Sequence, residues 1–280
     1  MLIKRKTLTT KVIPFIASLI LGLILIIPFV WMVICSFQNS ASDIFMNPPI
    51  LPKSFSFANY ITAINMLDIF KLLKNTLIII VFNMVFGIMS SLSVAYAFAR
   101  LKSRYKNILF AVLLSTMMLP WVVTMVPAYA IFYKLGFIGT FVPLIAPSIG
   151  GNAFFIFLTR QFMMGIPKEL DEAATIDGCG KFRTFFVIIV PLCKPIIVTM
   201  IIFSFQGGWS DYVGPNLYLG TFNNMHTLSI GLAKYVVANS ATPWHIVMAA
   251  CVMFSIPMIL VLLVGQRAIT RGVITTGLKD

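Results

Sequence analysis

Long apolar runs alternate with short polar stretches along this chain. A helix needs about 20 apolar residues to cross a hydrocarbon layer of about 30 Å, and six runs reach that length. We therefore expect membrane-spanning helices at residues 12–37, 75–99, 107–133, 141–164, 186–206 and 246–266. Pro120 and Pro127 interrupt the third run. The pattern predicts an all-α, polytopic membrane protein with six transmembrane helices that form one domain over residues 1–280.

The composition also favours a membrane protein. Hydrophobic residues make up 59% of the chain, charged residues only 10%, and the mean hydropathy is +0.97. A soluble domain could not hydrate such a surface. The net charge of +13 would suggest nucleic acid as the partner of a soluble protein, but the placement of the basic residues favours another explanation.

The basic residues gather in alternate loops. If both termini lie in the cytoplasm, the cytoplasmic segments hold 16 of the 21 lysine and arginine residues, as the positive-inside rule describes. Trp31, Trp209 and Trp244 then fall at the outer ends of spans, as in an aromatic belt. The first run is too long for a cleaved signal peptide, so we expect it to remain as a span. The partner of the basic residues is then the lipid bilayer, and no nucleic acid is expected.

One polar stretch, residues 167–190, separates the fourth and fifth spans. Pro167 suits the first position of a helix, and acidic residues follow in the first turns, where the helix dipole favours carboxylates. Gly178 and Gly180 are expected to end this helix, because glycine readily adopts the left-handed cap conformation. The stretch predicts a short amphipathic cytoplasmic helix, a glycine break and a second helix from about Lys181. An ordinary loop helix fits these residues equally well.

The sequence offers no catalytic, nucleotide or metal site. The stretch around Gly178 fails as a phosphate loop, because Thr175 and Phe182 replace the glycine and the hydroxyl residue that such a loop requires. The four cysteines suggest neither a disulfide nor a metal site, and the two histidines stand alone. Ionisable residues are almost absent from the span interiors, which argues against a proton-driven transporter. We expect no enzyme and no cofactor in this chain, and an energy source on another subunit.

Several polar residues in or near the spans are candidates for a solute path. Asn83 and Gln206 carry large amides that suit neutral hydroxylated solutes. Gln206 is followed by two glycines and then by Trp209, Asp211 and Tyr212, a set that can stack on a sugar face and bond its hydroxyls. Hydrogen bonds between helices, or an interfacial aromatic anchor, explain the same residues without any solute.

The order of residues in the polar stretch resembles the EAA loop of ABC-importer permeases. Glu172-Ala173-Ala174, Asp177-Gly178 and Pro191 match its E-A-A, D-G and final proline, while Cys179 and Val190 replace its usual alanine and leucine. The segment from Trp209 through Asp211 and Pro215 to Leu232 is similar to the W-N-D-F/Y, P and T-L-x-x-G-L pattern of carbohydrate permeases, with Ser210 in place of the asparagine. The tail from Arg271 to Lys279 is also similar to the ending of that family.

This resemblance implies a type I, maltose-permease-like ABC importer fold and a role in moving a sugar, expected to be an oligosaccharide, into the cytoplasm of a bacterium. It implies as partners a second homologous permease subunit, two ATPase subunits that bind ATP and Mg²⁺, and an extracytoplasmic solute-binding protein. The residues implied in coupling to the ATPase are Glu172, Ala173, Ala174, Asp177 and Gly178. Glu172 would contact a basic residue of the ATPase, and the small residues would allow close approach. A permease for another small polar solute and a membrane scaffold without a translocation path remain as alternatives.

Overall fold

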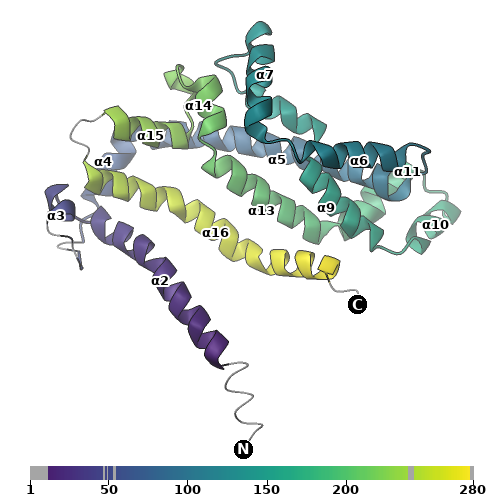
Figure 1. The fold of residues 1–280 in the computed structure, drawn as a ribbon, viewed down its shortest axis with the longest axis horizontal. Coiled ribbons are helices and arrows are strands. Elements are labelled where there is room, and N and C mark those ends of the chain that lie inside the picture. The colour runs from purple at the N-terminus through teal and green to yellow at the C-terminus, as the bar shows by residue number, and fades with distance from the viewer. Residues whose placement is uncertain (1–11, 47, 49, 53–54, 239–242, 278–280) are drawn as a thin grey trace, which may run out of the picture. The chain divides into compact units, whose positions relative to one another are not determined.

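The computed structural model describes residues 12–46, 48, 50–52, 55–238 and 243–277 (Figure 1). These residues form helices and connecting segments, and no strand is found among them. The helices in chain order are α2 (Ile13–Ser36), α3 (Ser42–Phe45), α4 (Ala58–Leu67), α5 (Ile69–Arg100), α6 (Lys106–Thr116), α7 (Trp121–Lys134), α8 (Val142–Ile145), η2 (Ala146–Gly150), α9 (Ala153–Met164), α10 (Glu169–Ile176), α11 (Lys181–Arg183), η3 (Thr184–Ile189), α12 (Val190–Leu192), α13 (Lys194–Ser210), α14 (Val213–Leu219), η4 (Asn223–Met225), α15 (Leu228–Ala238) and α16 (Trp244–Gly277). The chain forms two compact units, which are described in turn. The expectation of one domain stays a prediction.

The first unit draws on residues 1–69 and 232–256. Its helix α2 has 24 residues, and only Cys35 and Ser36 at its end are buried. The end of α2 is attached to α4, because the Asn59 amide donates hydrogen bonds to the carbonyls of Ser36 and Gln38, both at 2.8 Å. The rest of α2 is an exposed apolar surface, which is stable only against lipid or another protein.

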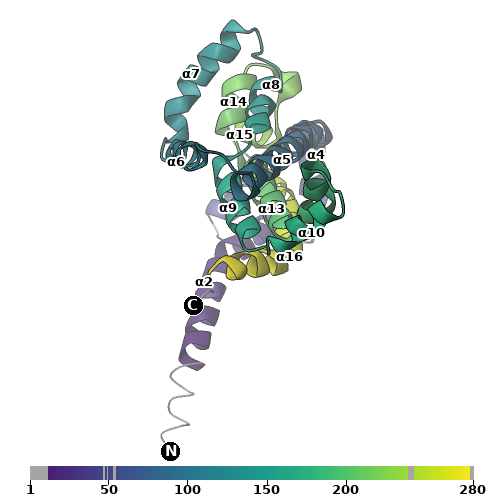
Figure 2. The ribbon, with the colours of Figure 1, turned by 90° about the vertical axis from the view of Figure 1, so that its right-hand side faces the viewer.

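The second unit, residues 70–231 and 257–280, contains the main core. Here α5, α9 and α13 lie side by side (Figure 2). Leu92 of α5, Ile156 and Met163 of α9, and Met200 of α13 are at most 2% exposed and pack in one cluster. A second cluster joins Ile79 of α5 to α14 and α15, with side chains of α7 packed against it. Burial of these apolar side chains, rather than helix propensity alone, holds the short helices in place.

Two of the expected spans are bent. The run at 107–133 forms α6 and α7, whose axes differ by 94°, and the break ends at Pro120. Proline has no N–H to continue the helix and disfavours helical backbone in the residue before it. Pro127 lies inside α7. The run at 186–206 is bent by 75° at Cys193, between Pro191 and Pro195.

The number of spans depends on how these bends are counted. Among the described residues, four helical segments are long and apolar enough to cross a membrane, and there are six if each bent pair counts as one span. The prediction of an all-α polytopic membrane protein is confirmed. The exact number of six spans stays a prediction.

Candidate functional site

The polar stretch folds as the sequence predicts, into two helices around a glycine turn. Helix α10 carries three acidic residues in its first turn and ends at Ile176. Gly178 has a φ of 75°, which favours glycine over every other residue. The N–H of Cys179 donates to the carbonyl of Ala174 at 2.8 Å, and the N–H of Gly178 donates to that of Thr175 at 3.1 Å. These two bonds form a Schellman cap, so Gly178 fixes where α10 stops. Gly180 instead begins the next helix.

The second helix is less regular than the sequence predicts. Residues Thr184–Ile189 form a π-helix between two short α-helical turns. π-Helical turns are uncommon and often lie at functional sites.

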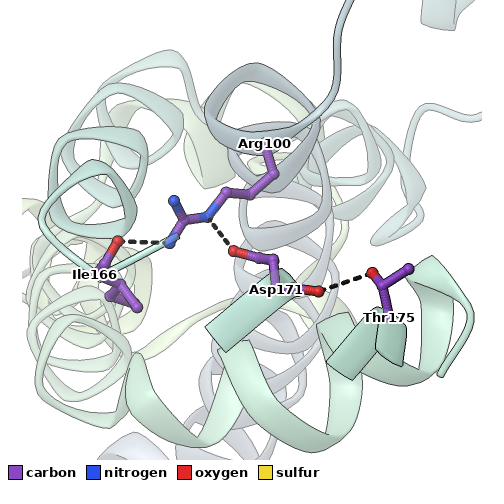
Figure 3. A network of polar contacts seen from close by, with 4 residues as sticks. All are labelled: Arg100, Ile166, Asp171 and Thr175. Carbon is purple, nitrogen blue, oxygen red and sulfur yellow. Dashed lines mark hydrogen bonds and ion pairs between the residues drawn. The ribbon is translucent and has the colours of Figure 1, made fainter. Parts of the chain in front are cut away.

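An ion pair attaches α10 to the end of α5 (Figure 3). Nε of Arg100 lies 3.1 Å from Oδ2 of Asp171, and the two side chains are 6% and 24% exposed. Nη2 of Arg100 also donates to the carbonyl of Ile166 at 2.7 Å. One guanidinium therefore holds both the segment before α10 and its first turn. The resemblance pointed to neither residue. The sequence did contain a signal for Arg100. It is a basic residue at the end of a span, where it can pair with an acidic residue of the cytoplasmic helix.

Much of α10 and its turn is exposed beside this ion pair. Glu172, Ala173 and Asp177 are exposed, as is Gly178 in the turn. Ala174 differs, because it is 2% exposed and its side chain faces this chain. Of the two alanines, Ala173 is therefore the one that is open to a partner, and the small size of Ala174 serves internal packing.

Two large apolar side chains near the glycine turn are also exposed, Ile176 at 86% and Phe182 at 83%. The sequence analysis gave neither residue a role in binding a partner. Large apolar side chains this exposed are candidates for a protein interface.

The solute-path candidates separate into two groups. Asn83 and Asp211 line one small cavity of about 40 Å³ together with Thr76, Gly208 and Thr227. Within the described residues, Oδ1 of Asn83 is buried without a hydrogen-bond partner. A cavity of this size holds a water molecule or one polar group of a solute.

Gln206, Trp209 and Tyr212 do not line this cavity. Gln206 and Tyr212 are exposed. Trp209 is 2% exposed and stacks on Phe205, with ring centroids 5.3 Å apart. A belt tryptophan must face lipid, so the aromatic-belt interpretation is wrong for Trp209.

The segment after α13 folds back onto the start of α5. The Asn75 amide donates to the carbonyls of Asn224 and His226, and the Thr76 hydroxyl accepts the N–H of Leu228 at 2.9 Å. The hydroxyl of Ser229 donates to the Asp211 carbonyl at 2.6 Å. These bonds hold the segment after α13 against α5, and Asp211 and Asn83 line the same cavity. The sequence analysis missed Asn75 and Thr76, although two adjacent polar residues at the start of an apolar run are a usable signal.

Comparisons with known proteins place the chain among transport proteins. Residues 83–275 match the family described as binding-protein-dependent transport system inner membrane component. The probable starch degradation products transport system permease protein AmyC of Thermoanaerobacterium thermosulfurigenes is 31% identical over 99% of this chain and 100% of its own. The sn-glycerol-3-phosphate transport system permease protein UgpE of Brucella abortus (strain 2308) is 34% identical over 92% of this chain and 94% of its own.

The fold has a counterpart among solved structures. A chain from a bacterial ABC transporter involved in the import of the acidic polysaccharide alginate matches with a TM-score of 0.80 and 22% identity, over 92% of this chain and 97% of that chain. The predicted type I ABC importer permease fold is thus confirmed. The family match covers well over half of the sequence, and the relatives match nearly end to end. The chain belongs to the family of binding-protein-dependent transport system inner membrane components.

Proposed function

We propose that this chain is a translocation subunit of an ABC importer that brings a sugar, and more specifically an oligosaccharide, into the cytoplasm. ATP hydrolysis on separate subunits, which bind the ATP and Mg²⁺, drives the movement. The observation that carries the proposal is the loop helix α10, which is anchored to this chain by Asp171 and exposed at Glu172, Ala173 and Asp177. A helix that is attached to its own chain and is also bound by a partner can transmit a movement of that partner to the rest of the permease.

The partner of that open face is an ATPase subunit. Glu172 and Asp177 present carboxylates to a basic groove, while Ala173 and Gly178 allow close backbone approach. Ile176 and Phe182 add an apolar contact of the kind that an amphipathic helix makes in a groove. The complete importer holds two such ATPase subunits, a second homologous permease subunit and an extracytoplasmic solute-binding protein. Both termini of this chain lie in the cytoplasm.

Three observations support a sugar as the solute. The relative named AmyC belongs to a system for starch degradation products, and the structural counterpart belongs to one for a polysaccharide. Asn83 and Asp211 place an amide and a carboxylate at one cavity, and these groups can bond sugar hydroxyls. Gln206 and Tyr212 extend the solute path along the exposed side of the same segment. Trp209 is buried behind these residues and supports the path by packing.

A polyol phosphate is the second candidate, because the relative named UgpE transports sn-glycerol-3-phosphate. Reconstitution of the assembled importer with ATP inside the vesicles separates the two. We expect uptake of labelled maltooligosaccharides in the presence of the binding protein. Uptake of sn-glycerol-3-phosphate without sugar uptake would establish the second candidate. Uptake of neither by an ATPase-active complex would favour another solute, or a scaffold subunit with no path.

A further inference from the structure

A second, larger cavity lies between the end of α5, the start of α6 and helix α10. It has a volume of about 660 Å³. Its basic lining residues are Arg100, Lys102, Lys106, Lys168 and Lys181. Asp171 and Glu172 are its acidic lining residues. None of these residues lines the cavity at Asn83 and Asp211.

Most of the positive charge in this cavity is not neutralised by the chain. Arg100 is paired with Asp171. Within the part of the chain that the structure describes, none of the four lysines forms an ion pair, and Nζ of Lys106 reaches only the carbonyl of Leu101, at 3.4 Å. Four ammonium groups therefore face one unpaired carboxylate, that of Glu172. Such a cavity attracts an anion, and several donors around it suit the oxygens of a phosphate group.

The position of the cavity along the chain indicates where this anion comes from. Tyr96 and Ala99, in the last turns of α5, form one wall, and Lys106 and Asn107, in the first turn of α6, form another. Only residues 101–105 separate these two apolar helices. Both apolar helices have an end at this cavity, so we place it toward the edge of the hydrocarbon layer, near the lipid headgroups. Lysine side chains at this depth reach toward the interface and attract anionic lipids.

We propose that this cavity binds the phosphate-bearing headgroup of an anionic phospholipid. The proposal does not depend on which solute is transported. Because Asp171 and Glu172 of α10 line the same cavity, a bound headgroup lies against the proposed coupling helix. The phosphate neutralises lysines on both sides of the Arg100–Asp171 pair, so the lipid stabilises α10 in the position seen here.

Lipid binding to the assembled importer tests the proposal. The complex is placed in nanodiscs of phosphatidylcholine with or without phosphatidylglycerol, and retained lipid is measured by native mass spectrometry. We expect phosphatidylglycerol to be retained by the wild type. Each basic residue near the surface contributes roughly a fivefold factor to such binding, so the double variant Lys102→Gln/Lys106→Gln should bind about 25-fold more weakly. Equal retention by this variant and the wild type would overturn the proposal.

Two further variants separate charge from folding. Lys74→Gln/Lys134→Gln removes the same charge at exposed lysines that do not line the cavity, and should retain the lipid fully. Lys102→Arg/Lys106→Arg keeps the charge and should bind as the wild type does. It also tests the site if the glutamine variant fails to assemble, because loss of lipid from a well-assembled arginine variant would contradict an electrostatic site.

Two other outcomes would assign the cavity to a different anion. Inorganic phosphate, titrated into phosphatidylcholine nanodiscs and followed by ³¹P NMR, should not bind in a lysine-dependent way. If it does, and phosphatidylglycerol is not retained, then the ligand is a free anion and the lipid proposal is wrong. If the permease pair alone retains the lipid and the complex with its ATPase does not, an acidic segment of the ATPase occupies the cavity, and the proposal fails for the assembled importer.

Discussion

Arg100 and Asp171 connect the last residue of α5 to the first turn of α10 through one contact of 3.1 Å. The guanidinium is almost fully buried, whereas the carboxylate keeps some contact with solvent. Removal of either residue leaves a charge that the chain no longer balances. The cost lies between about 1 kcal/mol for an exposed pair and about 3–5 kcal/mol for a buried one.

Asp171→Ala and Arg100→Ala should therefore each lower the melting temperature of the complex and reduce solute-stimulated ATP hydrolysis. The double variant should lose less stability than the sum of the two, by about 0.5–3 kcal/mol, because the pair is lost only once. Thermal unfolding and ATPase assays on the wild type, the two single variants and the double variant complete this double-mutant cycle. Strict additivity would show that the pair contributes nothing to holding α10.

Glu172→Lys should abolish solute-stimulated ATP hydrolysis while the chain is still inserted. The substitution places a cation opposite the proposed basic groove, and it costs about 0.3–1 kcal/mol against the helix dipole. Glu169→Lys is the matched control, because Glu169 is exposed in the same first turn and gives the same dipole cost. Wild-type stimulation in the Glu172 variant, or equal loss in both, would remove Glu172 from the proposed interface.

The proposed orientation predicts the side on which fused reporters are active. A reporter placed after Arg104 should be active in the cytoplasm, and one placed after Asn223 should be active outside. The reason is the uneven distribution of basic residues, since 16 of 21 fall on the cytoplasmic side. Paired alkaline phosphatase and green fluorescent protein fusions measure this. A reversed result at either site would contradict the arrangement of spans.

Trp209→Ala should reduce the amount of assembled complex. A buried tryptophan stacked on Phe205 leaves a large cavity when truncated, at a cost of about 3–5 kcal/mol. Tyr212→Ala, at an exposed aromatic residue three positions later, should change stability by less than about 0.5 kcal/mol. Quantitative blotting of the purified complex compares the yields of the two variants. A normal yield with lost uptake for Trp209→Ala would instead place this side chain in direct contact with the solute.

Asn83→Leu and Asp211→Asn should lower uptake per assembled complex and leave basal ATP hydrolysis unchanged. Loss of one hydrogen bond of about 1 kcal/mol corresponds to roughly a fivefold decrease in solute affinity. Asn65→Leu removes an exposed amide elsewhere in the chain and serves as the control. Uptake by Asn83→Leu that equals that of Asn65→Leu would assign the cavity to structural water.

The features that follow from local sequence were predicted well. The carboxylates in the first turn of α10 and its end at Gly178 depend on residues within one or two helical turns, so the local sequence was sufficient to predict them. The expected start at Pro167 was wrong, because α10 begins at Glu169 and Pro167 lies before its N-cap residue Lys168. The bend before Pro120 lies at an expected interruption, but its angle of 94° depends on packing of α7 against other helices. The size of this bend could therefore not be predicted from the sequence.

Contacts between distant segments were not predicted. The Arg100–Asp171 pair and the bonds from Asn75 to residues 224 and 226 join parts of the chain that no periodicity relates. The burial of Ala174 and Trp209 was missed for the same reason, since the motif indicates which residues are present and not which neighbours cover them. Asn83 and Asp211 were both named as candidates, but only the folded segment after α13 brings them to one cavity.

Helix α5 carries an attachment at each of its ends. Near its start, Asn75 and Thr76 hold the segment that follows α13, and at its last residue Arg100 holds α10. At 1.5 Å per residue the two attachments lie about 36 Å apart, with uninterrupted helix between them. A helix of this kind resists compression along its axis, so it keeps α10 and the segment around His226 at a fixed separation along that axis.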